Sequence, residues 1–275
     1  MTTRWRGFGF FLFVCVASAH GACDPKPTPT EPARARSPEA PQAAPGEGQP
    51  QTTQPLAHAL PPEHHPPATP ASIARKSYVI AALGDSITDS RSGGGGYLKQ
   101  LQAACPQSVI LNFGKGGDMT NQMLRRLKAD ILPMVGQKNI DTLIVYGGVN
   151  DLYSDLTAGR TNSIIERDLS TMYMLARAAG LRVVAVTVSP WSGFSKYWNP
   201  RRGENTRLLN SWILGQVADG TISQVVDSFA LLSCGNPDEL CPDYQGRWRD
   251  GLHPGPLGHA KLGEKVVQVG FEDCR

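Results

Sequence analysis

A serine, a histidine and an aspartate in this chain have the types and spacing that acyl transfer requires. Ser86 stands in G-D-S-I-T at 84–88, directly after an apolar run. Four of the six histidines lie before residue 66, and of the other two His253 has Asp250 three residues before it. A serine hydroxyl is a weak nucleophile until a neighbouring base takes its proton, and an acid orients that base. These three residues therefore predict a catalytic triad.

The segments that must position the triad alternate between strand-like and helical patterns. Five apolar runs have the length of buried strands: 78–83, 108–113, 142–146, 182–188 and 223–227. Runs of this kind separated by helices are typical of a parallel sheet covered on both faces. Such sheets bind ligands at the carboxyl ends of their strands. Ser86, Gly117 and Asn150 each follow one of the first three runs, so we expect them to meet at that edge.

Four short motifs stand in order along the chain. They are G-D-S-I-T at 84–88, N-F-G-K-G-G at 112–117, G-V-N-D at 148–151 and D-G-L-H at 250–253. In these motifs the chain resembles the SGNH (GDSL) hydrolase family over residues 78–269. The resemblance implies an α/β fold of flavodoxin-like, three-layer architecture with a central parallel sheet of about five strands, the SGNH hydrolase fold.

The resemblance also implies a role for each matching residue. Ser86 corresponds to the nucleophile, His253 to the general base and Asp250 to the acid that orients it. The expected oxyanion hole consists of the backbone N–H groups of Ser86 and Gly117 and the side-chain amide of Asn150. Gly116 is one residue from the matching position and stays open as an alternative to Gly117. No metal ion and no organic cofactor are expected.

The N-terminal residues have the features of an export signal. Arg4 and Arg6 precede an apolar run at 7–19 that small residues follow, which predicts a signal peptide over 1–22. The run is shorter than the roughly 20 apolar residues that a membrane span needs. Cys23 ends a segment that resembles a bacterial lipobox and is a lipidation candidate, although His20 stands where leucine is usual. A cell-envelope lipoprotein attached to the membrane through Cys23 and a freely secreted protein both remain open.

The segment at 23–72 differs in composition from the rest of the chain. Fourteen of the 22 prolines lie here, and large apolar residues are nearly absent. Such a composition cannot bury enough apolar surface to offset the entropy of ordering, so it predicts a Pro-rich disordered tether. The remaining residues, 73–275, are expected to form one hydrolase domain.

The charge and the cysteines restrict the class of protein further. The net charge of +3 is too small to indicate a nucleic-acid partner. Four cysteines follow Cys23, and an even number in an exported protein predicts two disulfides. Of the three pairings, we favour Cys234–Cys241 as a loop clip and Cys105–Cys274 as a staple for the C-terminus. A four-cysteine zinc site is the rival, but the chain has no C-x-x-C spacing.

These observations favour an exported serine ester hydrolase that acts through an acyl-enzyme. The tether and the tryptophan-rich loop at 191–198 suit deacetylation of carbohydrate or other short-chain esters. A lipase, lysophospholipase or thioesterase acting on longer acyl chains is the alternative. A non-catalytic glycan-binding lipoprotein is the alternative from another class. The sequence does not give the oligomeric state.

Overall fold

The computed structural model describes residues 75–274 of the 275-residue chain. The predicted signal peptide at 1–22, the tether at 23–72 and the lipidation candidate Cys23 lie outside the described residues. None of the helices that the structure describes is long and apolar enough to cross a membrane.

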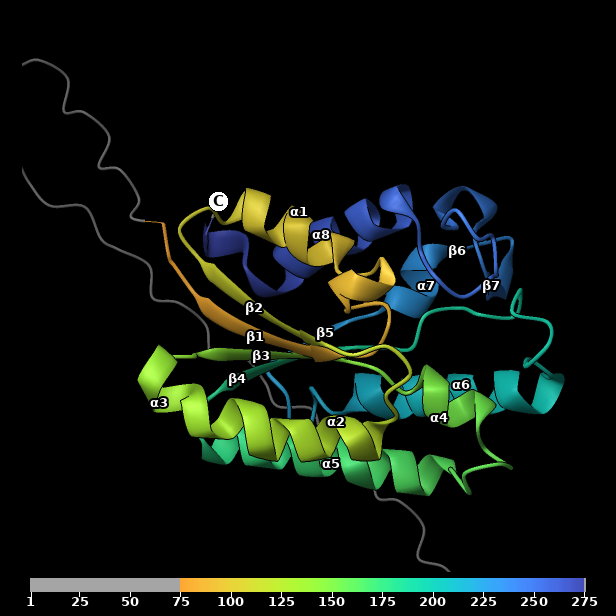
Figure 1. Ribbon diagram of the computed structural model, residues 1–275, viewed down its shortest axis with the longest axis horizontal. Helices are drawn as coiled ribbons and strands as arrows, with labels where there is room; N and C mark the ends of the chain where they lie inside the picture. The colour runs from red at the N-terminus through yellow and green to blue at the C-terminus, as the bar shows by residue number, and fades with distance from the viewer. Residues whose placement is uncertain (1–74, 275) are drawn as a thin grey trace, which may run out of the picture. The chain divides into compact units, whose positions relative to one another are not determined.

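A parallel sheet of five strands forms the centre of the described part (Figure 1). Its strands are β1 (Val79–Gly84), β2 (Val109–Gly114), β3 (Thr142–Tyr146), β4 (Arg182–Val186) and β5 (Gln224–Val226). Their order is β2-β1-β3-β4-β5, and every neighbouring pair is parallel. This is the flavodoxin-like order, so the predicted fold is confirmed. The order reverses at β1, which places a ligand crevice beyond the carboxyl end of that strand.

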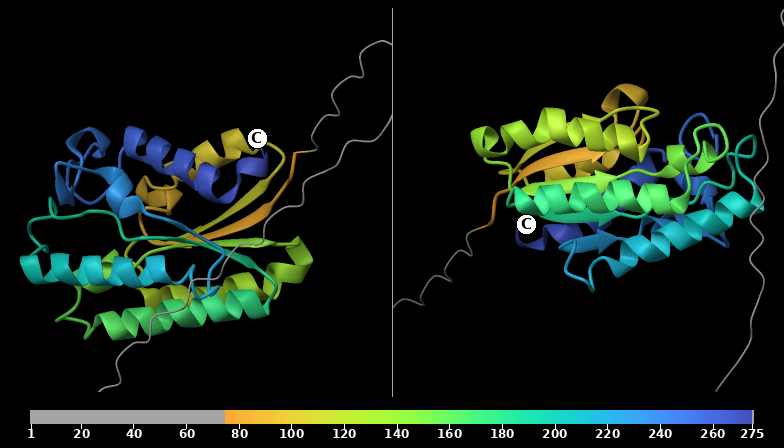
Figure 2. Two further views of the ribbon diagram at one scale, coloured as in Figure 1. Left: turned by 180° about the vertical axis from the view of Figure 1, so that it is seen from behind. Right: turned by 90° about the horizontal axis from the view of Figure 1, so that it is seen from below.

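Helices cover both faces of the sheet and make three layers (Figures 1 and 2). One face carries α1 (Gly96–Ala104), α7 (Ser228–Leu232) and α8 (Pro256–Gly270). The other carries α2 (Thr120–Arg126), α3 (Val135–Lys138), α4 (Val149–Tyr153), α5 (Asn162–Ala178) and α6 (Pro200–Gly215). The sequence pattern did not predict α4, α7 or the small antiparallel hairpin of β6 (Ser233–Cys234) and β7 (Asn236–Leu240). Elements of two to five residues are too short to show a periodic pattern.

The strands read as continuous apolar runs because both of their faces are buried. In β1, Ala81 and Leu83 belong to the core beneath α2, α5 and α6. Ile80 and Ala82 belong to the core beneath α1 and α8. Successive side chains of a strand point to opposite faces, so each core takes every second residue.

Threonine is a common helix N-cap, so the sequence predicts that Thr120 caps the helix that follows it, but the start of α2 differs. The N-cap residue is Met119, and Thr120 is the first residue of the helix. The backbone N–H and the hydroxyl of Thr120 both donate to the Asp151 carboxylate of α4, each over 2.9 Å. A carboxylate of another helix therefore accepts from the N–H of the first residue of α2, while Met119 and Gln122 form the local capping box.

The two disulfides are the pairings favoured from the sequence. Cys105 pairs with Cys274 and ties the end of α1 to the C-terminal segment, with 5.2 Å between their Cα atoms. Cys234 pairs with Cys241 across the β6–β7 hairpin. By the chain-entropy model, the bridge over 169 residues stabilises by about 5 kcal/mol and the bridge over seven by about half of that. The backbone N–H of Lys76 also donates to the carbonyl of Asp273, so the two ends of the described chain lie together.

Candidate active site

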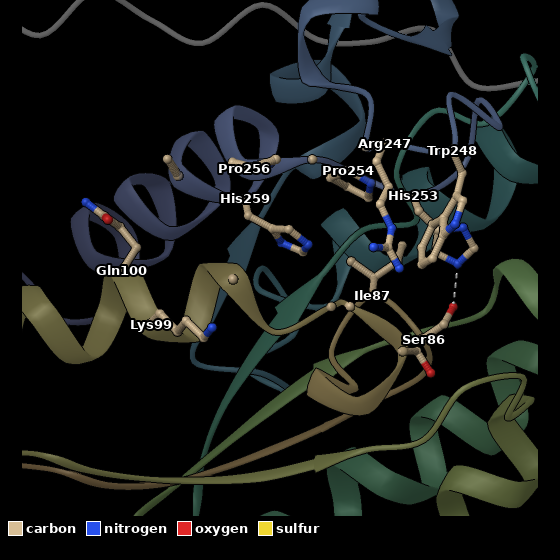
Figure 3. A pocket seen from close by; sticks show the side chains of 17 residues that line it. Ser86, Ile87, Lys99, Gln100, Arg247, Trp248, His253, Pro254, Pro256 and His259 are labelled. Carbon is tan, nitrogen blue, oxygen red and sulfur yellow. Dashed lines mark hydrogen bonds between the residues drawn. The ribbon is translucent and has the colours of Figure 1, made fainter.

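The structure brings the three predicted triad residues together, and Figure 3 shows two of them, Ser86 and His253. Ser86 lies in the turn after β1, and its Oγ is 2.9 Å from Nε2 of His253. Nδ1 of His253 is 2.7 Å from Oδ2 of Asp250. The serine and the histidine are 167 residues apart in the sequence, so the fold and not local structure makes this contact. The chain of contacts is the one that activates a serine nucleophile.

The loop that carries Asp250 and His253 fixes the carboxylate in place. Oδ1 of Asp250 accepts hydrogen bonds from the backbone N–H groups of Leu252 (3.0 Å) and His253 (2.9 Å). Burial alone would raise the pKa of Asp250, but the hydrogen bonds from His253 and Leu252 outweigh it and hold that pKa below its usual value. The carboxylate is therefore ionised at neutral pH and stabilises the proton on Nδ1.

The turn after β1 leaves the N–H of Ser86 free to bind a ligand. The carbonyl of Asp85 accepts from the N–H groups of Thr88 and Asp89, and the Asp85 carboxylate accepts from that of Ile87. The N–H of Ser86 has no acceptor among residues 75–274. Only glycine fits at position 84, because a Cβ there would lie 2.8 Å from the carbonyl oxygen of Tyr146.

The loop after β2 separates the two glycine candidates for the oxyanion hole. The N–H of Gly116 donates to Oδ2 of Asp89 over 3.1 Å, so it is already occupied. The N–H of Gly117 has no acceptor within the described part of the chain. Gly117 has a φ of +81°, which favours glycine, and nothing lies within 4 Å of where a Cβ would be. The geometry therefore favours Gly117 over Gly116.

Asn150 contributes a side-chain amide from the first turn of α4. Its Nδ2 donates to the carbonyl of Asp118 over 2.9 Å and lies 3.4 Å from Oδ2 of Asp85. The second contact is long, so one N–H of the amide is only weakly engaged. Asn150, Gly117, Ser86 and His253 all line one cavity of about 500 Å³. The predicted oxyanion donors and the predicted base therefore face the same space.

Arg126 at the end of α2 ties together the loops that carry these donors. Its guanidinium donates to the carbonyls of Gly84 (2.9 Å) and Phe113 and to the carboxylate of Asp118 (2.6 Å). Gly84 precedes the Ser86 turn, and the carbonyl of Asp118 holds Asn150. One half-buried cation thus fixes the ends of β1 and β2 relative to α4.

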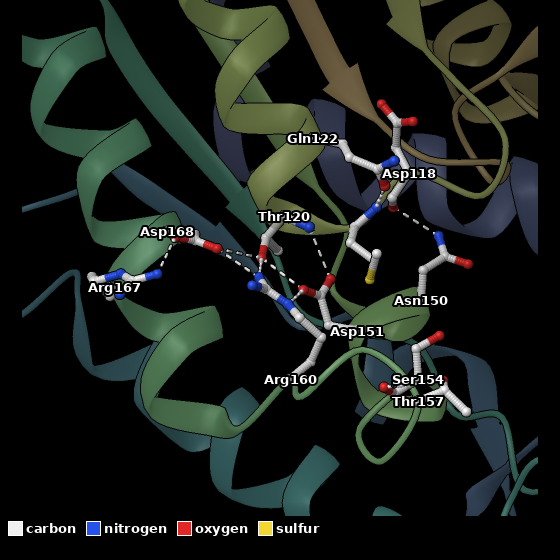
Figure 4. Close-up of polar contacts among 11 residues, drawn as sticks. Asp118, Thr120, Gln122, Asn150, Asp151, Ser154, Thr157, Arg160, Arg167 and Asp168 are labelled. Carbon is white, nitrogen blue, oxygen red and sulfur yellow. Dashed lines mark hydrogen bonds and ion pairs between the residues drawn. The ribbon is translucent and has the colours of Figure 1, made fainter. Parts of the chain in front are cut away.

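A buried ion network holds α4 itself (Figure 4). Oδ1 of Asp151 accepts from Arg160 over 2.7 Å, and Arg160 also contacts Asp168 over 2.5 Å. Arg167 contacts the other oxygen of Asp168, so two cations meet two carboxylates. Asp151 also accepts from the N–H of Thr120, so it joins α4 to the start of α2. Each of these charges has an opposite charge beside it, which offsets part of the cost of burying them next to Asn150, although burial still raises the pKa of Asp151.

Asp85 is the one carboxylate at the site that has no basic partner among the described residues. It is almost fully buried beneath Ser86 and Asn150. Burial raises the pKa of Asp85 to about 6, although the Ile87 N–H and the charge of His253 lower it. Its charge at neutral pH therefore costs stability, and its contacts with Ile87 and Asn150 hold the turn and the amide in position.

We expect Asp85→Asn to change how stability depends on pH. The pKa of Asp85 is about 6 in the folded chain and about 3.9 in an unfolded one, so the folded state binds this proton more tightly. The stability that the folded state gains by binding this proton is fully present below about pH 4, and it is lost as the pH rises through 6. In urea unfolding, the gain in free energy of unfolding of Asp85→Asn over the wild type should therefore be about 2 kcal/mol larger at pH 7.5 than at pH 4. The exposed Asp243→Asn variant serves as the control, and an equal shift in both variants would contradict the assignment.

Aromatic side chains line the site, but not the set that the sequence suggested. Trp191 is buried and donates from Nε1 to Thr206 over 2.9 Å, so it packs in the core. Phe194 of the same loop does line the cavity, together with Tyr153 of α4. Trp248 also lines it, with its ring centroid 6.1 Å from that of His253. The sequence analysis missed Trp248, although it stands only two residues before Asp250.

The comparisons with solved structures agree with this architecture. A GDSL-like lipase from Bacteroides thetaiotaomicron has a TM-score of 0.54 and 20% identity, over 71% of this chain and 88% of that one. A lipase/acylhydrolase from Enterococcus faecalis has a TM-score of 0.55 and 21% identity, over 70% and 94%. An acetyl xylan esterase has a TM-score of 0.54 and 20% identity, over 69% and 98%. At these identities the likeness shows the fold alone.

A search of curated proteins finds none that matches this chain.

The comparison with family models identifies the family. The model of the GDSL-like lipase/acylhydrolase family matches residues 82–261, which include Ser86, Gly117, Asn150, Asp250 and His253. The match spans more than half of the chain and covers all four motifs. The chain therefore belongs to the GDSL-like lipase/acylhydrolase family.

Proposed function

We propose that this protein is an exported serine ester hydrolase that removes acetyl or other short acyl groups from carbohydrate esters. The observation that carries the catalytic part is the contact chain from Ser86 Oγ through His253 to Asp250, at 2.9 and 2.7 Å. The export part rests on the predicted signal at 1–22.

The reaction follows from the placement of these groups. Nε2 of His253 takes the proton of Ser86 as Oγ attacks the ester carbonyl carbon. The oxygen that becomes negative is stabilised by the N–H groups of Ser86 and Gly117 and by the amide of Asn150, each worth about 3 kcal/mol. His253 then protonates the leaving alcohol, and an acyl group remains on Ser86. Water, deprotonated by His253, releases the acid and restores the serine.

Two observations favour a carbohydrate ester over a long acyl chain. Tyr153, Phe194 and Trp248 line the cavity beside the oxyanion donors, and aromatic faces of this kind pack well against sugar rings. One of the neighbours in fold is an acetyl xylan esterase, which is a short-chain carbohydrate esterase by its name. Both observations concern the substrate, and the proposed export rests on the predicted signal at 1–22 alone.

A series of p-nitrophenyl esters from acetyl to palmitoyl tests the proposal. We expect kcat/KM to be highest for the acetyl or propionyl ester and to fall by about tenfold or more at the octanoyl ester. Each methylene contributes up to about 1 kcal/mol, favourably where the acyl pocket buries it and unfavourably where the pocket is too short. A maximum at long chains would replace the proposal with the lipase or thioesterase alternative. A complete lack of hydrolysis, together with binding of xylan or another glycan, would favour the non-catalytic glycan-binding protein.

A further inference from the structure

A second cavity, of about 630 Å³, opens from the same serine and histidine on the side of α1 and α8 (Figure 3). It contains none of the other predicted oxyanion donors, and it shares six lining residues with the first cavity: Ser86, Ser92, Gly93, Arg247, Trp248 and His253. His253 must protonate the leaving oxygen, so the alcohol part of the substrate lies beside its imidazole. The residues after His253, up to the start of α8, line this cavity. It is therefore placed to receive the alcohol part of the ester.

The charged side chains that line this cavity are all basic. Lys99 of α1 and Arg247 are the cations, and no aspartate or glutamate lines the cavity. Neither cation takes part in an ion pair with another described residue. Arg247 lies over the ring of Trp248, 4.7 Å from its centroid, which holds the guanidinium at the mouth of the cavity. By contrast, Arg91 at the edge of the first cavity is neutralised by Asp89 at 3.0 Å.

A buried histidine adds an unsatisfied polar group to the same wall. His259 of α8 is 5% exposed and lines the cavity, yet its Nδ1 has no hydrogen-bond partner among the described residues. Burial, together with the charges of His253 and Lys99, lowers the pKa of His259 to about 4, so the ring is neutral at physiological pH. A neutral imidazole can still donate one hydrogen bond to a ligand. Buried polar groups without a partner are rare, so this imidazole is an unsatisfied polar group in the wall of the cavity.

The first turn of α1 forms the adjoining wall. Gly96 begins this nine-residue helix and lines the cavity, and its N–H has no acceptor among residues 75–274. A Cβ on Gly96 would lie 2.8 Å from the ring of His259, so the helix start and the imidazole are in direct contact. The N-terminus of a helix favours negative charge. A free helix start, an unpartnered imidazole and two unpaired cations therefore line one space.

We propose that this cavity binds an anionic group on the alcohol part of the substrate, so that the preferred substrate is an acyl ester of an acid-bearing alcohol such as an acidic sugar. The inference rests on the proposed ester hydrolase function and names its substrate class. A carboxylate or a phosphate would satisfy the same donors. The cavity of about 630 Å³ is large enough for an alcohol that carries such an anion, since small-molecule sites occupy about 300–1,000 Å³.

The experiment compares matched acetyl esters with the full chain. 3-Acetoxybenzoate and 3-acetoxyphenyl phosphate carry an anion, and 3-acetoxybenzamide is the neutral reference. We expect kcat/KM for at least one anionic ester to exceed that of the amide by about tenfold, and this ratio to fall by more than half when the ionic strength is raised to about 0.5 M. The anion that is preferred identifies a carboxylate-bearing or a phosphorylated alcohol. Equal kcat/KM values for all three esters would overturn the proposal while leaving the ester hydrolase function intact.

Variants assign the preference to this cavity. Lys99→Met and Arg247→Met should each lower the anion-to-amide ratio by about threefold to tenfold. Lys128→Met removes an exposed positive charge from the opposite layer and should leave the ratio unchanged. Lys99 lines this cavity and not the first, whereas Arg247 lines both, so an unchanged ratio in Lys99→Met would overturn the assignment.

A binding measurement keeps the two proposals separate. If no ester is hydrolysed, the proposed function fails, and calorimetric titration of the chain with 3-hydroxybenzoate and with 3-hydroxyphenyl phosphate tests the cavity alone. Binding of either anion that Lys99→Met weakens by about threefold to tenfold supports the anionic site. A lack of binding to both anions, or affinities that the variant does not change, contradicts it.

Discussion

Ser86→Ala is expected to reduce ester hydrolysis by about 10⁴-fold to 10⁶-fold, the largest effect of any single change in this chain. The variant keeps the N–H of residue 86, Gly117 and Asn150, so it retains the oxyanion donors but has no atom that can form the acyl-enzyme. Steady-state rates with p-nitrophenyl acetate, measured against the uncatalysed rate, give the effect.

The matched control is Ser163→Ala, which removes an exposed hydroxyl at the start of α5. It should have wild-type activity, and both variants should melt within a few degrees of the wild type. Activity that survives in a folded Ser86→Ala variant would assign the nucleophile to another residue.

Asp250→Asn is expected to lower kcat by about 10³-fold to 10⁴-fold at neutral pH. The carboxylate accepts from Nδ1 of His253 at 2.7 Å and carries the charge that stabilises the imidazolium. An asparagine amide can present an N–H to Nδ1, which places the proton on Nε2 and prevents that atom from accepting the proton of Ser86. The KM should change little, because Asp250 lines neither cavity.

Asp243→Asn tests whether the loss belongs to the triad or to the charge of this region. Asp243 is an exposed acid in the same C-terminal part of the chain. We expect kcat within about twofold of wild type for this variant, as for most surface changes. A loss of similar size in both variants would mean that the local field and not the Asp250–His253 contact supports the base.

The sheet and the triad could be predicted from the sequence because their signals are local. β3 occupies the predicted residues 142–146, since a strand buried on both faces is a continuous apolar run. Ser86 and His253 were found from a strand-end serine and a histidine with an acid three residues away. The structure then added the distance between them, which no sequence pattern contains.

The parts of the site that could not be predicted depend on contacts between distant segments. Arg126 and Arg160 are ordinary helical or loop arginines in the sequence, and only the fold brings Asp118 and Asp151 to them. The prediction that Thr120 caps α2 was wrong for the same reason. Its hydroxyl donates to Asp151 of α4. The short α4 that carries Asn150 has five residues and no periodic pattern to reveal it.

The direction of β1 separates the start of the described chain from the predicted catalytic serine. The strand runs about 17 Å from Val79 to Gly84, and Ser86 stands just beyond its far end. Residue 75, the first that the structure describes, therefore lies near the rim opposite the catalytic mouth, where Lys76 meets Asp273. Immobilisation of the domain through a surface residue at that rim should therefore not slow the turnover of bulky esters.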